Sequence, residues 1–438
     1  MSETSDTGYL PLRRGAAAGL DHHLRYGLAM LGPISTAGSQ FLLSLQLLHG
    51  LNAVAFGGFS FLMVVSAFCT GLWSALFCAP MPVLLSKGAQ EERAAMLRCL
   101  LSANLAAALL ALLAFLLIGI LLGIPPQAAM LFAVYVALML LRWFARAHAY
   151  VAGAQGRVVA CDIAYGSLML CCVALLHATG RASLVPAYCG LLAAAGFSLL
   201  PFGANYLKRQ FLHVSLRDLA GYGAIWRTHS SWSLIGVVTT EATANAHAYI
   251  VTLVAGPAAF AVVAASALLI RPVGVAMNAL TDFERPRMAR AIADGARGGV
   301  LGLVRFFRLA LVMVWLATLA LSVTLMVFDP RLVFPAHYRV EDIVTGGVLW
   351  LVIAGVRLMR TPESTMLQAA GQFRPLAHAS IWSCGASVAA VGTILALGGP
   401  LWSIAGILLG EIVFALLVGR QARRWRRAED VGAPTAIT

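Results

Sequence analysis

Long apolar stretches alternate along this 438-residue chain with gaps whose charge depends on their position. If each stretch is a membrane helix, every second gap lies on one side, and the gaps of one side contain only three of the 31 Lys and Arg residues: Arg181, Arg331 and Arg339. Basic loops stay on the cytoplasmic side of membrane proteins. The pattern therefore predicts a multi-pass protein of the bacterial inner (plasma) membrane with both its N- and C-termini in the cytoplasm.

Twelve stretches approach or exceed the roughly 20 residues that a helix needs to cross the hydrocarbon core. They cover residues 26–49, 54–84, 99–123, 128–151, 158–179, 183–206, 230–255, 258–280, 300–328, 343–361, 375–397 and 400–419. Helix is predicted because open strands would leave backbone groups unpaired in lipid. Charged residues are only 11% of the chain, against about a quarter in soluble proteins. The fold class is therefore an all-α integral membrane protein.

A polar, basic stretch separates the sixth span from the seventh and divides the spans into six and six. We therefore predict five regions. They are a cytoplasmic N-terminal segment (1–25), an N-terminal six-helix bundle (26–207), a cytoplasmic linker (208–229), a C-terminal six-helix bundle (230–419) and a basic cytoplasmic tail (420–438).

Short segments of one half reappear in the other. Gly-Gly-Phe-Ser at 57–60 and Ala-Ala-Phe-Ala at 258–261 open the second and eighth spans, which places Phe59 and Phe260 201 positions apart. Turns that contain Gly156 and Gly371 follow the fourth and tenth spans, 215 positions apart. The difference of 14 is about the extra length of the outward gap at 329–342. Because six is even, the two bundles share one orientation and form a parallel, pseudo-symmetric repeat.

Ionisable groups inside a membrane are the default functional candidates, because a charge at mid-bilayer costs about 2.5–3.5 kcal/mol. The seventh span is the most polar. Glu241 and Asn245 lie one turn apart, and Thr240, Thr243 and His247 share an adjoining stripe. This face should line a protein interior or a watery cavity, which makes Glu241, Asn245, Thr240 and His247 candidates for substrate binding.

Arg271 lies deep in the eighth span and is followed by Pro272, which removes a backbone hydrogen bond and kinks the helix. A planar guanidinium can bind a phosphate group with two parallel hydrogen bonds. Alternatively, Arg271 pairs with Glu241 and neutralises a buried charge. The two interpretations are compatible, since an ion pair can open when an anion arrives.

The tenth span ends with Arg357 and Arg360, which share a helix face and have counterparts in Arg142 and Arg146 of the fourth span. For Arg142, Arg146 and Arg360, we expect the side chains to extend to lipid phosphates. Arg357, one turn deeper, is equally well explained as a cavity residue. Glu411 in the twelfth span has no obvious partner and is either a structural hydrogen-bond acceptor or a proton-titrating group.

The sequence offers no cofactor or metal chemistry. Its eight cysteines form no CxxC pair and lie in or beside apolar stretches, and His22 and His23 have no further ligands nearby. Walker, Gly-x-Ser-x-Gly and HExxH motifs are absent, so we expect neither ATP hydrolysis nor familiar hydrolytic chemistry. The net charge of +13 is spread over helix ends that face anionic lipids, which argues against nucleic-acid binding.

The two six-span halves, the Gly-Phe-Ser opening of the second span, the Ala-x-Gly turns and the Leu-Ile-Arg-Pro run at 269–272 together resemble the polysaccharide transporter branch of the MOP flippase superfamily. The resemblance covers about residues 20–420. It implies two bundles in a V around a central cavity that opens to each side in turn. Arginines in that cavity would bind the diphosphate of an isoprenoid-linked oligosaccharide.

The resemblance thus implies a flippase, not an enzyme, that moves an undecaprenyl-diphosphate-linked oligosaccharide to the periplasmic leaflet for surface polysaccharide biosynthesis such as O-antigen export. Its partners would be this substrate, membrane lipids and a polysaccharide polymerase or export machinery. In that transporter branch, the arginines of the cavity commonly occur in spans one, two and eight. Arg271 matches the last, whereas spans one and two lack a central Arg or Lys, and Arg25 is the candidate substitute. Glu241, His247 or Glu411 could couple transport to protons.

Other functions remain open. A cation-coupled multidrug-type exporter of the same superfamily would be expected to have an acidic residue in its first bundle, and spans one to four have none. A membrane enzyme of glycan assembly would need reactive groups on a sizeable outward loop, and the longest outward gap is only 329–342. A scaffold for such enzymes would not depend on Arg271.

Overall fold

The computed structural model describes residues 16–86, 89–180, 182–212 and 215–430, and every regular element in these ranges is a helix. The all-α fold class predicted from the sequence is therefore confirmed. The predicted N-terminal segment and basic tail lie partly outside the described residues.

The first half of the chain consists of six long helices. They are α1 (Ala16–Gly50), α2 (Ala53–Trp73), α4 (Gln90–Leu121), α5 (Pro126–Val151), α6 (Gln155–Thr179) and α7 (Leu184–Phe197). A π-helical turn, η1 (Ser74–Cys78), extends α2, and the short helix α3 (Met81–Ser86) follows it. Within this half, α1 packs along α6, and α5 packs against α4 and α7.

The second half repeats this plan with α11 (Ser231–Ala255), α12 (Pro257–Ala267), α13 (Arg271–Ala293), α14 (Arg297–Phe328), α15 (Val340–Ala369), α16 (Phe373–Gly398) and α17 (Ser403–Asp430). Here α12 and α13 form one bent span. The 3₁₀ turn η4 (Leu268–Ile270) separates them and ends just before Arg271 and Pro272, so the α-helix is interrupted where the sequence predicts a kink.

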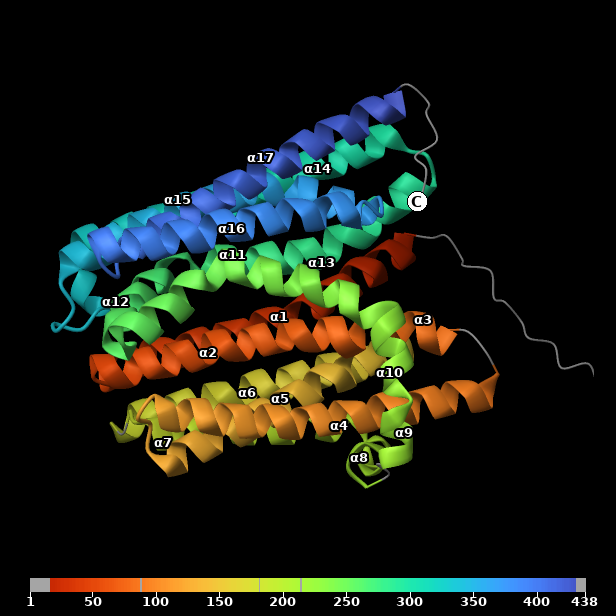
Figure 1. Ribbon diagram of the computed structural model, residues 1–438, viewed down its shortest axis with the longest axis horizontal. Helices are drawn as coiled ribbons and strands as arrows, with labels where there is room; N and C mark the ends of the chain where they lie inside the picture. Colours follow the sequence, from red (N-terminus) through yellow and green to blue (C-terminus); the bar gives the residue numbers. More distant parts are fainter. Residues whose placement is uncertain (1–15, 87–88, 181, 213–214, 431–438) are drawn as a thin grey trace, which may run out of the picture.

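Between the halves, the chain forms a 3₁₀ turn, three short helices and a second π turn. These are η2 (Leu200–Phe202), α8 (Ala204–Phe211), α9 (Leu216–Ala220), α10 (Tyr222–Ile225) and η3 (Trp226–Ser230). They cover the segment that the sequence analysis predicts as a linker. Figure 1 shows α8 and α9 at the end of the first bundle, away from the second.

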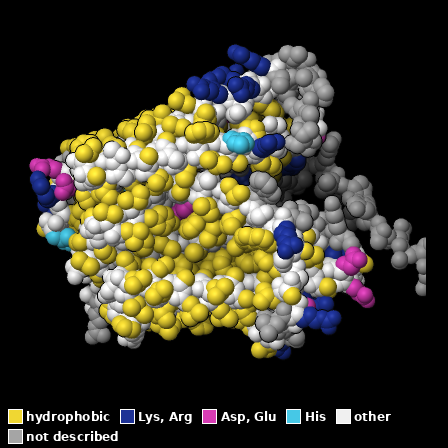
Figure 2. Space-filling model, in the orientation of Figure 1, with side chains coloured by type: hydrophobic (Ala, Val, Ile, Leu, Met, Phe, Trp, Pro, Cys, Tyr) yellow, Lys and Arg dark blue, Asp and Glu magenta, His cyan; other side chains and the backbone are white. Residues whose placement is uncertain are grey.

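The surface is that of a membrane protein. Hydrophobic side chains cover its middle, and most charged side chains gather toward the two ends (Figure 2). Ten helices among the described residues are long and apolar enough to cross a membrane. The other two predicted spans, α1 and α11, contain 35 and 25 residues and also exceed the length required. The chain is a multi-pass membrane protein.

The two halves form separate bundles that meet chiefly where α2 lies along α12 (Figure 1). Helix α11 also contacts α2, and α13 contacts α1. The helices that open the second and eighth spans are thus the main contact between the bundles. Their shared role supports the predicted pseudo-symmetry.

The structure corrects the register of that repeat. Since α2 begins at Ala53 and α12 at Pro257, Phe56 matches Phe260 at an offset of 204 rather than 201. The turns after α5 and α15 have the same geometry, with Gly153 (φ 71°) and Gly371 (φ 73°) in equivalent places 218 positions apart rather than 215. Both predicted offsets were three residues short. Three residues make nearly one helical turn, so the shifted alignment kept the same faces together.

The predicted difference of 14 residues between the two offsets is unchanged by this correction, but its source is only partly the outward loop. The loop from 329 to 339 is seven residues longer than its counterpart at 122–125. Another four residues lie in α15, which has 30 residues against 26 in α5. The insertion in the second half is therefore distributed along the chain.

Candidate functional site

The polar face of α11 meets the first bundle. The Oε1 atom of Glu241 accepts hydrogen bonds from the Nδ2 of Asn245 at 3.0 Å and from the hydroxyl of Tyr249 at 2.9 Å. The Tyr249 ring packs edge-on against Phe61 of α2, with 5.9 Å between centroids. Glu241 and Asn245, which the sequence placed one turn apart, therefore act together beside α2. Tyr249, two turns from Glu241, was missed because its ring suggests packing rather than a polar contact.

Glu241 forms no ion pair with any described residue, and its side chain is half-buried. Both of its hydrogen-bond donors are neutral. A carboxylate with neutral partners at the contact between two bundles can still bind a proton or a small cation, whereas a carboxylate held by arginine cannot do so without losing its partner.

The other α11 candidates point elsewhere. His247 is buried inside the second bundle between the rings of Phe260 (5.9 Å) and Trp350 (5.2 Å). Thr240 is exposed, and Thr243 packs against α16, where its carbonyl accepts a hydrogen bond from Ser387 at 2.9 Å. The structure therefore does not gather the predicted α11 residues into one site.

Arg271 opens α13 and has an exposed side chain. It makes no hydrogen bond or ion pair with a described residue. The alternative in which Arg271 pairs with Glu241 is therefore not what the structure shows, and that carboxylate is bonded to Asn245 and Tyr249. Helix α13 contacts α1 of the first bundle, which carries Arg25. The Arg25 side chain lies outside the described residues.

Glu411 of α17 is buried between two arginines of α15. Its two carboxylate oxygens lie 2.7 Å from the Nε of Arg357 and 2.8 Å from the Nε of Arg360. The Arg360 guanidinium also lies over the ring of Phe414, 4.4 Å from its centroid. Glu411 thus acts as a structural hydrogen-bond acceptor, which was one of the two predicted alternatives. The expectation that Arg360 extends to lipid phosphates is wrong, because this carboxylate offers a stronger, desolvated partner.

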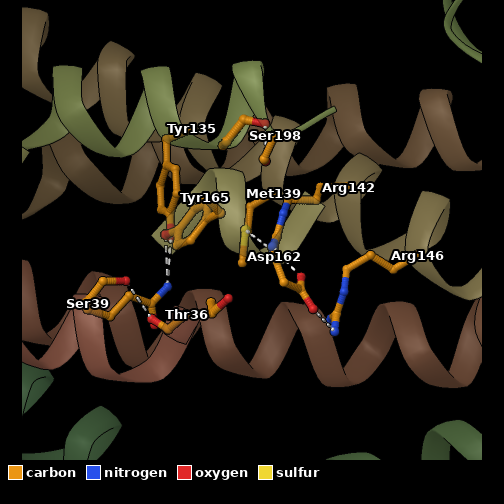
Figure 3. A network of polar contacts seen from close by, with 11 residues as sticks. Thr36, Ser39, Tyr135, Met139, Arg142, Arg146, Asp162, Tyr165 and Ser198 are labelled. Carbon is orange, nitrogen blue, oxygen red and sulfur yellow. Dashed lines mark hydrogen bonds and ion pairs between the residues drawn. The ribbon is translucent and has the colours of Figure 1, made fainter. Parts of the chain in front are cut away.

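The first bundle contains a similar cluster on α5 and α6 (Figure 3). Asp162 lies 2.6 Å from the Nη2 of Arg142 and 2.9 Å from the Nη2 of Arg146. Arg142 is fully buried and lies over the ring of Tyr165, 4.6 Å from its centroid. Snorkelling by Arg142 and Arg146 was therefore the wrong expectation. Asp162, a lone acidic residue in an apolar span, was the missed signal.

Helix α1 closes over this cluster. A Cβ at Gly32 would come within 2.9 Å of the Asp162 Cβ, so the two helices need a glycine there. About two turns further along α1, the Nε2 of Gln40 donates to the hydroxyls of Tyr165 at 3.1 Å and Tyr135 at 3.5 Å. Gln40, a polar residue of the first span, is thus used inside the bundle, for helix packing.

A third carboxylate shows the same arrangement. Glu363 of α15 contacts Arg308 of α14 and Arg426 of α17. Asp162, Glu411 and Glu363 are therefore each shared by two guanidinium groups, and each cluster carries a surplus positive charge. Among the residues that the structure describes, no group of three or more His, Cys, Asp or Glu could hold a metal ion.

Comparison with solved structures identifies the fold. The structure matches the inward-facing conformation of a multidrug resistance MATE family transporter of the MOP superfamily, with a TM-score of 0.64, 14% identity, and coverage of 94% of this chain and 100% of that one. The chain has the MATE transporter fold. No protein-family model matches the sequence, and no curated protein matches it.

Two further MATE structures agree. The eukaryotic transporter AtDTX14 matches with a TM-score of 0.64 at 14% identity, covering 93% of this chain and 99% of that one. A variant of the Vibrio cholerae transporter VcmN matches with a TM-score of 0.61 at 12% identity, covering 94% and 98%. The outward-facing MATE structure has a lower TM-score, 0.59, than the inward-facing one. These neighbours establish the fold of this chain, and the MOP superfamily and its polysaccharide branch stay predictions from the sequence.

Proposed function

We propose that this protein is a transporter that moves an amphiphilic substrate across the membrane by alternating access between its two bundles. The MATE fold, the separate bundles and the main contact along α2 and α12 support this proposal. A transporter needs one contact region that persists and another that opens, and helices with matching positions in the two halves suit such a rocking motion. We place the protein in the bacterial inner membrane with both ends cytoplasmic.

The structural neighbours favour a cation-coupled exporter of the multidrug type as the first candidate. The observation that carries it is Glu241, a carboxylate beside the contact of α11 with α2 that has only neutral hydrogen-bond partners. Asp162 and Glu411 are unsuitable for coupling because arginines already neutralise them. Protonation of Glu241 would change its bonds to Asn245 and Tyr249, and thereby the packing of α11 on α2.

This candidate can be tested in proteoliposomes with a proton gradient and ethidium as the transported probe. Glu241→Gln is expected to lower proton-driven ethidium transport about tenfold or more, since the coupling energy between two sites is typically 1–3 kcal/mol. Glu341→Gln is the matched control, because that carboxylate is 82% exposed on the surface. If Glu241→Gln transports ethidium with the pH dependence of the unchanged protein, Glu241 is not the coupling group.

The second candidate is a flippase for a lipid-linked oligosaccharide carried on a diphosphate. Charge favours it, because the buried Asp162 and Glu411 and the half-buried Glu363 are each outnumbered by arginines. Arg271 is also exposed without a described partner. A surplus of positive charge in a low-dielectric interior attracts an anionic headgroup and repels a cationic drug. The polysaccharide polymerase or export machinery would then be its partner.

A deletion strain distinguishes the two candidates. A flippase predicts that diphosphate-linked precursor accumulates and that Arg271→Gln fails to restore export, while Arg217→Gln, an exposed residue of α9, restores it. A drug exporter predicts greater ethidium sensitivity without precursor accumulation. If Arg271→Gln restores export fully, a scaffold or an enzyme of glycan assembly becomes the better explanation.

A further inference from the structure

A cavity of about 340 Å³ lies in the first bundle, at the end where α8 is placed. Its wall is formed by α4, the last turns of α5, the start of α6, η2 and α8. None of the α11 residues and none of the three carboxylate clusters line it. The cavity is therefore separate from the site to which the transport function is assigned.

The cavity is positively charged. Arg157 from the first turn of α6 and Arg209 from α8 both line it, as does His148 of α5. No Asp or Glu is among its described lining residues, and neither arginine forms an ion pair with a described residue. Two guanidinium groups beside one cavity without a counter-charge favour an anion there.

One arginine is held in place by the backbone. The Nη1 of Arg157 donates to the carbonyl of Phe202 at 3.2 Å, which ties the first turn of α6 to η2. This bond uses one of the five N–H groups of the guanidinium and leaves the others free to bind a ligand. A fixed guanidinium loses less entropy on binding than a freely rotating one.

Apart from Asn205, the remaining wall is mostly apolar and aromatic. Leu97 and Leu101 of α4 and the ring of Phe202 line one part. The His148 and Tyr206 rings stack with 5.5 Å between centroids. Small residues, including Gly203, keep the space open. The cavity can thus hold an apolar or flat group next to an anion.

We propose that this cavity binds a phosphate ester, whose phosphate oxygens contact Arg157 and Arg209 and whose apolar part lies against Leu97, Leu101 and Phe202. Guanidinium groups bind phosphate through paired, charge-assisted hydrogen bonds. The cavity lies at the ends of the helices that are joined by the basic loops, which we expect on the cytoplasmic side. Anionic lipid headgroups gather at the cytoplasmic surface. The phosphate ester is supplied either by an anionic phospholipid or by a soluble metabolite.

Native mass spectrometry of the full-length protein in detergent tests this proposal with phosphatidylglycerol and glycerol 3-phosphate as the two probes. We expect binding of at least one probe, weakened about tenfold or more in the double variant Arg157→Gln/Arg209→Gln, since this variant loses the charged hydrogen bonds to the phosphate. Arg217→Gln, outside the cavity, is expected to bind like the unchanged protein. Preferential binding of phosphatidylglycerol assigns the cavity to a lipid, and equal binding of glycerol 3-phosphate assigns it to a soluble ligand.

Ala204→Phe provides a second, independent variant, because it fills the cavity and leaves both arginines in place. This variant is expected to weaken binding of the same probe, and its result decides the test if the double variant does not fold. The proposal is overturned if neither probe binds, or if the folded variants bind both probes as tightly as the unchanged protein. Ethidium transport is not part of this readout, so either result leaves the transport proposal standing.

Discussion

Gly57 of α2 lies directly against the carbonyl group of Pro257, the first residue of α12. A Cβ on Gly57 would overlap this carbonyl and would approach the backbone nitrogen of Ala261 to 3.3 Å. The first turns of the second and eighth spans thus touch backbone to backbone. This close approach joins the two bundles at one end, while Figure 1 shows their other ends further apart.

Substitution at this contact is expected to weaken it. Gly57→Ala must push α2 away from α12, because the colliding atoms belong to the backbone and cannot rotate aside. Overpacking of this kind costs about 1–3 kcal/mol. Thermal unfolding in detergent should show a lower midpoint. Gly236→Ala on α11 is the control, since a Cβ there meets nothing within 4 Å and should keep or raise stability by up to about 1 kcal/mol.

Asp162 is expected to be essential for folding of the first bundle. Asp162→Asn leaves Arg142, whose side chain is 1% exposed, without a counter-charge. Removal of one partner from a buried ion pair costs about 3–5 kcal/mol. The midpoint temperature of thermal unfolding should therefore be much lower in this variant. The triple change Asp162→Leu/Arg142→Met/Arg146→Met should be more stable than Asp162→Leu alone, and the opposite order would contradict the charge explanation.

Loss of the Glu411 charge should destabilise the second bundle in the same way. Glu411→Gln removes the charge that Arg357 and Arg360 share, at a carboxylate that is 1% exposed, and should also cost about 3–5 kcal/mol. Glu341→Gln breaks a surface ion pair with Arg339 and should cost at most about 1 kcal/mol. Comparable losses in stability from the two variants, measured by unfolding in detergent, would show that Glu411 is not a structural residue.

The inner ends of α2 and α11 are joined at one carbonyl group. The Leu76 carbonyl, within the π turn η1, accepts hydrogen bonds from the Tyr222 hydroxyl at 2.8 Å and from the Ser230 hydroxyl at 2.9 Å. Burial raises the pKa of Tyr222, so its phenol stays protonated and able to donate near neutral pH. These bonds connect the first half to the start of the second across both π turns.

Loss of both donors should loosen this connection. Tyr222→Phe/Ser230→Ala removes two hydrogen bonds, each with a net contribution of about 0.5–1.5 kcal/mol. Amide hydrogen exchange in η1 and η3 is expected to become faster, while exchange in the middle of α5 stays unchanged. Equal protection of η1 in the variant and the unchanged protein would show that these bonds do not hold the two ends together.

The sequence by itself determined the class of the protein and its plan. Apolar stretches of sufficient length required membrane helices, because no other open structure satisfies its backbone in lipid. The repeated short segments indicated two related halves, and the proline after Arg271 located a bend. These features follow from composition and local spacing, which the linear sequence contains in full.

Only the tertiary structure decided which charges meet. Asp162 and Glu411 come from helices α6 and α17, while their arginines come from α5 and α15. The arginine helices α5 and α15 correspond in the repeat, whereas the carboxylate helices α6 and α17 do not. Periodicity places a residue on a face of its own helix but does not say which neighbour covers that face. The register of the repeat was ambiguous for a similar reason, since a shift of three residues nearly completes one turn and keeps the same faces aligned.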